Sequence, residues 1–187
     1  MNIIQTSIAG VLIIEPAVFR DNRGFFTETY HQKRYHDCDI HQVFVQDNLS
    51  YSVQNTLRGL HYQIKHSQAK IVQALSGQIF DVAVDIRADS PTFGKWTGVY
   101  LSDKNFRQLF IPEGFAHGFC VLSQTALVSY KCSDFYQPED EGGILWSDPD
   151  IGINWPIKDP IISEKDKVLP QLFELLPEQL PRPQNGR

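Results

Sequence analysis

Short β-rich runs separated by Gly, Pro, Asn and Ser fill the sequence from Val43 to Cys132, and this spacing constrains the fold more than any other feature. The clearest run is Ile79–Ile86, in which apolar side chains alternate with the carboxylates Asp81 and Asp85. A period of two is typical of a strand with two different faces. Many short strands favour a closed or double-sheet architecture, because open sheet edges invite pairing with other chains. We therefore expect an all-β sandwich or barrel.

The same pattern predicts the individual strands, which are Val11–Ile14, Phe25–Tyr30, Val43–Tyr51, Leu57–Gln63, Lys70–Leu75, Ile79–Ile86, Trp96–Leu101, Gln108–Ile111, His117–Leu122 and Ala126–Lys131. Ser76 and Gly77 separate the fifth strand from the sixth, and a Gly-containing turn predicts that these two pair as a hairpin. Helical periodicity is scarce: we expect a short helix near His31–Asp39 and a helical turn around Gln171–Leu176. The length fits one domain over residues 1–187, with a frayed tail over residues 177–187.

Charge and cysteine content exclude several classes of protein. The formal net charge of −5, without a basic stripe, argues against a nucleic-acid duplex as partner. No apolar run approaches the ~20 residues that span a bilayer, and the N-terminus lacks a positively charged leader. Three cysteines without CxxC spacing suit a reducing compartment better than a disulfide scaffold. We expect a cytoplasmic protein that binds neither nucleic acid nor membrane.

His61 lies on a predicted strand, on a face that lines either solvent or a cavity. Taken alone, it is more typical of a half-buried histidine hydrogen-bonded to a neighbour. The other basic residues on the predicted strands change this interpretation. Arg58 precedes His61, Lys70 opens the next strand and His117 lies on a later one. Basic groups are costly to place inside one barrel unless an anion accompanies them. These residues therefore predict a site for an anionic substrate.

His61 and His117 also suggest a metal site of the kind that cupin barrels hold, because imidazole is the commonest metal ligand. The spacing argues against it, since no second histidine lies two residues after His61 and His66 falls in a polar loop. Arg58 and Lys70 would also repel a cation. We expect neither a metal nor an organic cofactor, while a metal-dependent cupin enzyme stays open as an alternative.

Other polar segments can be interpreted in two ways. Tyr130, on a strand face with apolar neighbours, is typical of a core tyrosine. Tyr136 fits either a corner tyrosine or a platform for stacking a base. Arg20–Glu28 and Gln46–Asn48 mix guanidinium, amide and carboxylate groups. They fit a turn and a solvated strand edge, or the binding of phosphate and base edges, because Arg pairs bidentately with phosphate.

Short motifs follow one another along nearly the whole chain: RGFF at 23–26, LRGLHYQ at 57–63, DVAVDIR at 81–87, SPTFG at 90–94, IPEGFAHGF at 111–119, ILWSDP at 144–149 and SEKD at 163–166. Each motif alone is weakly specific, but the ordered set resembles the dTDP-4-dehydrorhamnose 3,5-epimerase family, whose members make an activated L-rhamnose precursor. The resemblance implies a homodimeric jelly-roll cupin barrel with short peripheral helices that works without a metal.

The resemblance also implies roles for single residues. His61 matches the base that removes protons next to the C4 ketone, with Asp166 as the carboxylate that orients it. Tyr130 matches the acid on the opposite face and Lys70 the support of the enolate oxygen. Arg23 and Glu28 are implied to reach into the neighbouring subunit's site. The other implied substrate-binding positions are Phe26, Gln46, Asp47, Asn48, Arg58, His117, Glu141, Lys165 and Tyr136, of which Tyr136 stacks on the thymine.

These residue types suit proton removal beside a ketone. An imidazole has a reference pKa of about 6.5 and a phenol one of about 10, so the first can accept a proton and the second keeps one until needed. We expect an isomerase that converts dTDP-4-dehydro-6-deoxy-D-glucose to dTDP-4-dehydro-L-rhamnose by inverting C3 and C5. Inversion of C3 or C5 alone and a non-catalytic sugar-nucleotide binding module stay open. So does the choice between Asp166 and Asp81 as partner of His61.

Overall fold

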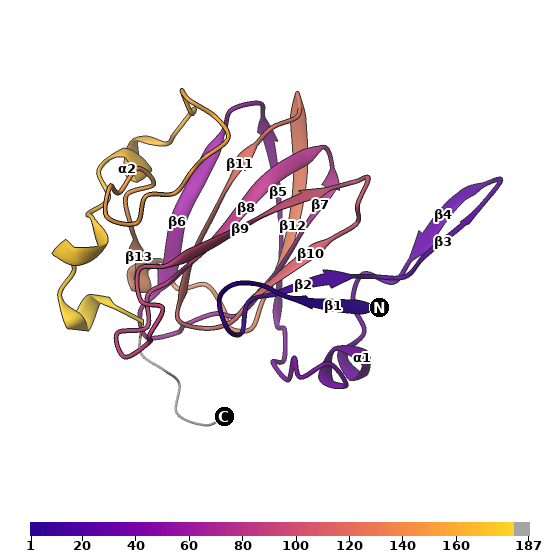
Figure 1. The fold of residues 1–187 in the computed structure, drawn as a ribbon, viewed down its shortest axis with the longest axis horizontal. Helices are drawn as coiled ribbons and strands as arrows, with labels where there is room; N and C mark the ends of the chain where they lie inside the picture. Colours follow the sequence, from indigo (N-terminus) through magenta and orange to yellow (C-terminus); the bar gives the residue numbers. More distant parts are fainter. Residues whose placement is uncertain (182–187) are drawn as a thin grey trace.

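Two β-sheets face each other in the computed structural model, which describes residues 1–181 (Figure 1). The six-stranded sheet has the order β1 (Asn2–Gln5), β2 (Leu12–Glu15), β10 (Gln108–Ile111), β7 (Lys70–Ser76), β12 (Thr125–Cys132) and β5 (Gln46–Val53). The five-stranded sheet has the order β13 (Glu141–Gly143), β6 (Leu57–Gln63), β11 (Phe115–Val121), β8 (Gln78–Asp85) and β9 (Trp96–Ser102). The expected all-β jelly-roll is confirmed.

Strand β8 shows how the alternating sequence builds the layers. Ile79 and Ala83 point between the sheets, into a core that also contains Val72 and Val128 of the opposite sheet. The alternate side chains, Phe80 among them, pack on the outer face of the five-stranded sheet against the C-terminal segment. Burial of each aliphatic side chain contributes about 1.5–3 kcal/mol, so both faces of β8 hold the fold together.

The predicted hairpin between β7 and β8 is wrong, because the two strands belong to different sheets. β7 pairs with β10 and β12, whereas β8 pairs with β9 and β11. One residue, Gly77, separates β7 from β8, and the usual tight hairpin has a two-residue loop. Gly77 has a φ of +79°, and a Cβ there would lie 2.2 Å from the Thr125 carbonyl oxygen. Only glycine fits this corner, which takes the chain across to the other sheet.

Several boundaries differ from the expected ones. Strands β1, β13 and β3 (Val18–Asp21) were not predicted, β4 is limited to Gly24–Thr27, and β5 begins at Gln46. Helix α1 (Gln32–His36) and the 3-10 turn Leu172–Glu174 lie inside the predicted helical ranges. The further short helices are α2 (Glu164–Lys167) and the 3-10 turns Pro138–Asp140 and Pro177–Gln179.

The expected frayed tail does not begin at residue 177, since Pro177–Gln179 is helical and Leu180 is buried against the outer core. The rest of that expectation, residues 182–187, lies outside the described residues. Among residues 1–181, no helix combines the length and apolar character needed to cross a membrane.

The β3–β4 hairpin projects away from the two sheets as an arm (Figure 1). Its side chains Phe19 and Phe26 are 64% and 68% exposed in the single chain. Large exposed aromatic side chains on a projecting element are typical of an interaction surface.

Candidate active site

A cavity of about 660 Å³ opens between the sheets and extends to α2. Its walls come from β5, β6, β7, β11, β12 and the segment Ile161–Asp166. Seven of the candidate residues line it, namely Arg58, His61, Lys70, His117, Tyr130, Lys165 and Asp166. The chain therefore gathers basic, acidic and phenolic groups that are far apart in the sequence into one cavity.

A local irregularity in β6 allows both Arg58 and His61 to face this cavity. Residues three apart on a regular strand point to opposite faces. Here the pairing of β6 with β11 shifts register, because His117 pairs with His61 while Phe119 pairs with Arg58. Gly59 lies in this shift with a φ of +120°, and a Cβ there would come within 2.5 Å of the Gly118 Cα. The glycine permits the bulge, and the bulge brings both basic side chains to one side.

His61 is held by Asp166 and not by Asp81. Its Nε2 lies 2.8 Å from Oδ1 of the Asp166 carboxylate, which is buried in α2. Burial opposes ionisation of Asp166, but the hydrogen bonds from His61 and from the Gly59 backbone N–H lower the pKa of this carboxyl. An ionised carboxylate accepts the Nε2 proton, so the lone pair of the imidazole is left on Nδ1. Nδ1 lies 4.0 Å from a Glu141 carboxylate oxygen.

Lys70 and Tyr130 lie on the facing sheet, where Tyr130 pairs in register with Val72 of β7. Burial lowers the pKa of the Lys70 ammonium, while the nearby Cys132, Asp81 and Glu141 raise it. Burial raises the pKa of the Tyr130 phenol, so this group keeps its proton at neutral pH. The cavity thus contains an imidazole with a free lone pair, a protonated phenol and a half-buried lysine.

A second cavity of about 310 Å³ continues from the first, with which it shares His61, Lys70 and Tyr130. Gln46, Asn48, Tyr136 and Glu141 add amide, phenol and carboxylate groups to its wall. Glu141 accepts hydrogen bonds from the Tyr136 hydroxyl, at 2.8 Å, and from the Lys165 ammonium. Burial opposes its ionisation, but these two hydrogen bonds lower the pKa of its carboxyl.

The structure keeps four candidate residues away from both cavities. Arg23, Phe26 and Glu28 belong to the β3–β4 arm or follow it, where Arg23 pairs with Asp21 and Glu28 with Arg34. Asp47 lies on the opposite face of β5 from Gln46 and Asn48, and it pairs with Lys131 at 2.7 Å. Asp47 therefore lines neither cavity of its own chain, and its substrate contact stays a prediction.

Sequence reasoning missed several side chains that support the site. Ser52 accepts a hydrogen bond from Arg58 Nε at 3.0 Å, and the Ser163 hydroxyl caps α2 by accepting from the Asp166 backbone N–H. Gln63 exchanges hydrogen bonds with the Gln137 backbone and lines the second cavity. The period of two in β5 could have indicated Ser52, because it shares a face with Asn48.

Metal ligation has no ready site in the described part of the chain. Within residues 1–181, no group of three or more His, Cys, Asp or Glu side chains is arranged to hold a metal ion.

Comparison with known proteins agrees with this geometry. A family model described as dTDP-4-dehydrorhamnose 3,5-epimerase matches residues 5–174. The enzyme of that name from Shigella flexneri is 56% identical over 168 residues, which is 89% of this chain and 93% of the relative.

Solved structures agree as well. The epimerase of Legionella pneumophila, in complex with dTDP-4-keto-L-rhamnose, superposes with a TM-score of 0.95 at 50% identity, covering 98% of this chain and 99% of the other. A 3'-monoepimerase from Streptomyces bikiniensis, in complex with dTDP-quinovose, gives a TM-score of 0.85 at 32% identity, with 90% and 86% covered. Sequence, fold and the contents of the cavity agree, and the chain belongs to the dTDP-4-dehydrorhamnose 3,5-epimerase family.

Proposed function

We propose that the chain is an isomerase that inverts C3 and C5 of dTDP-4-dehydro-6-deoxy-D-glucose, giving dTDP-4-dehydro-L-rhamnose. The observation that carries this proposal is the His61–Asp166 pair, which opens into the same cavity as Tyr130 and Lys70. Both carbons flank the C4 ketone, so one base and one acid can serve both inversions. The high identity to enzymes of this name supports the choice of substrate.

The residues divide the work of each inversion. His61 Nδ1 takes the proton from the carbon next to the ketone, and Asp166 stabilises the resulting imidazolium. Lys70 offers fixed positive charge to the developing enolate oxygen, which makes that proton removable. Tyr130 then returns a proton from the opposite face. A positioned general acid or base contributes about 10²- to 10⁴-fold to the rate, so each group matters on its own. The chemistry needs proton transfer and a fixed charge, and the proposal includes neither a metal nor an organic cofactor.

The nucleotide is proposed to bind in the second cavity and beside α2. Arg58 and Lys165 supply positive charge for the diphosphate, and Tyr136 offers a ring for stacking on the thymine. Gln46, Asn48 and Glu141 supply hydrogen-bonding groups around them.

A homodimer is part of the proposal, with Arg23, Phe26 and Glu28 completing the site of the neighbouring subunit. The projecting arm and its exposed phenylalanines support this arrangement. The exposed apolar side chains Leu49 and Tyr51 on the edge strand β5 offer a surface against which a second copy can pack. A cytoplasmic location is also proposed, and the three unpaired cysteines support it.

Inversion at a single carbon is the nearest alternative, because the monoepimerase from Streptomyces bikiniensis shares this fold. Incubation with the 4-ketosugar nucleotide in heavy water, followed by NMR of the product, separates the two activities. We expect deuterium at both C3 and C5 with both centres inverted. Deuterium at one carbon alone would rule out the double epimerase. Turnover that disappears with a chelator and returns with iron would favour the metal-dependent cupin enzyme instead.

A further inference from the structure

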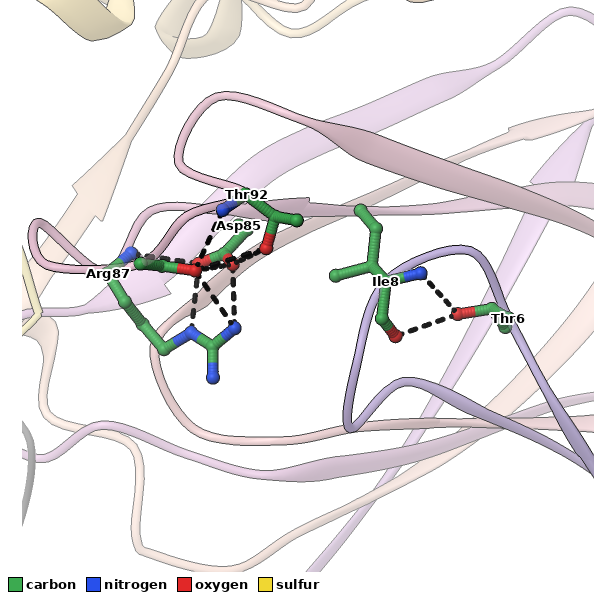
Figure 2. Close-up of polar contacts among 6 residues, drawn as sticks. Thr6, Ile8, Asp85, Arg87 and Thr92 are labelled. Carbon is green, nitrogen blue, oxygen red and sulfur yellow. Dashed lines mark hydrogen bonds and ion pairs between the residues drawn. The ribbon is translucent and has the colours of Figure 1, made fainter.

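Two buried carboxylates, Asp81 and Asp85, lie on the same face of β8 with no exposed surface, but they differ in their hydrogen bonds. Asp85 accepts from Arg87 Nε and Nη2 at 2.9 and 2.6 Å and from the Thr92 hydroxyl at 2.6 Å (Figure 2). It also accepts from the Ser90 hydroxyl at 2.6 Å. Asp81 accepts from His117 Nε2 at 2.8 Å through Oδ1. Its Oδ2 is buried and has no hydrogen-bond partner among residues 1–181.

An unpaired buried acceptor is costly, at about 1–3 kcal/mol and more when it is charged. Such groups in native proteins call for an explanation, and a role in catalysis is one. The position of Asp81 fits that explanation. Its hydrogen-bond partner His117 and its register partner Phe119 both line the large cavity. Asp85 instead holds the loop after β8, away from both cavities, where its hydrogen bonds are structural.

Lys70 lines the same cavity as His117, the hydrogen-bond partner of Asp81. The charge of Asp81 acts on Lys70, together with those of Cys132 and Glu141. Burial raises the pKa of the Cys132 thiol, so this group is neutral at neutral pH, and Glu141 is already engaged by Lys165. The other ionisable groups on the cavity are Tyr51, Arg58, His61, His117, Tyr130, Lys165 and Asp166. Arg58 and Lys165 disfavour a further positive charge, while Asp166 is held by His61.

We propose that Asp81 is a positioning residue of the epimerase reaction, which holds the His117 ring through Nε2 and supplies the negative charge that keeps Lys70 an ammonium ion. This inference deepens the proposed function and rests on it. Lys70 must carry its charge when the enolate forms, and its burial alone works against that charge. On the five-stranded sheet, the buried carboxylate of Asp81 on β8 compensates for this burial, together with Glu141 on β13, which Lys165 already engages.

The Asp81→Asn variant tests this role, because its amide oxygen can still accept from His117 while the charge is lost. We expect kcat to fall about tenfold, the scale of effects from groups that act through a neighbour. Loss of the negative charge destabilises the ammonium, so Lys70 gives up its proton at a lower pH. The high-pH limb of kcat/KM therefore moves to lower pH, while the affinity for dTDP, measured by calorimetry, stays unchanged.

Asp85→Asn is the matched control, since it removes a carboxylate from the same strand and the same face. We expect this variant to melt at a lower temperature and to keep the wild-type high-pH limb. The proposal is overturned if Asp81→Asn keeps that limb, or if Asp85→Asn moves it equally.

A measurement on the wild-type enzyme covers the case in which Asp81→Asn does not fold. The ¹³C NMR signal of the Asp81 carboxyl should report an ionised group at pH 7, and a protonated carboxyl would overturn the proposal. Failure of the proposed function is seen separately, because a wild-type enzyme without that function incorporates no deuterium at C3 and C5.

Discussion

The two imidazole–carboxylate pairs of the molecule have equal lengths and different surroundings. His61 and His117 are register partners on β6 and β11, and each Nε2 lies 2.8 Å from a carboxylate oxygen. The side chain of His61 is 31% exposed and that of His117 is 8% exposed. The accessible pair can pass a proton to and from a substrate, whereas the buried pair serves as a fixed charge. Solvent exposure of the imidazole, and not the length of its hydrogen bond, therefore distinguishes the proposed base His61 from His117.

Removal of the accessible imidazole gives the largest expected effect. In the His61→Ala variant we expect kcat to fall about a thousand-fold, because the general base is lost. The affinity for dTDP, measured by calorimetry, should stay within a factor of about two, since the proposed nucleotide contacts are made by Arg58, Lys165 and Tyr136 and not by His61. A non-catalytic binding module would show no turnover in the wild type, so wild-type turnover is the control that decides between these two functions.

Glu141 lies on the accessible side of His61, where its carboxylate is 4.0 Å from the free Nδ1 and also accepts hydrogen bonds from Tyr136 and Lys165. For Glu141→Gln we expect KM to rise about tenfold with a smaller change in kcat, since hydrogen bonds to a charged group contribute about 1.5–3 kcal/mol. Glu139→Gln, two residues away at an exposed position, is the control and should match the wild type. A change in kcat alone would instead place Glu141 in the proton transfer.

Asp47 should give the smallest effect. Its carboxylate faces away from the cavities and pairs with Lys131, and exposed ion pairs contribute about 0–1 kcal/mol. In the Asp47→Asn variant we expect KM and kcat to stay within a factor of about two, as measured by steady-state kinetics. A large rise in KM would show that Asp47 reaches substrate in the assembled protein and would restore the role that the resemblance implies.

The strand pattern was predictable where two kinds of side chain alternate along the sequence, as in β8, although both faces of this strand are buried. The crossing between the sheets at Gly77 was not predictable, because a Gly-containing turn has the same local sequence whether the chain forms a hairpin or crosses to the other sheet. Helix α2 has four residues, too few to show helical periodicity.

Part of the site was predictable from the alternation of side chains along the strands. The basic residues on predicted strands indicated an anion site, since each strand sets which side chains share a face. Asp166 is 105 positions from His61, so their contact follows from tertiary structure, and the sequence pointed to it only through the family resemblance. The bulge at Gly59, which turns Arg58 towards the cavity, breaks the alternation on which strand reasoning depends.

The division of labour between His61 and Tyr130 is tested most directly by the Tyr130→Phe variant in heavy water. This variant keeps the base and loses the acid on the opposite face. We predict that it exchanges the protons at C3 and C5 for deuterium through His61 while the configuration at both carbons is retained, as seen by NMR of the sugar nucleotide. Inversion at the wild-type rate, or no exchange at either carbon, would contradict this account.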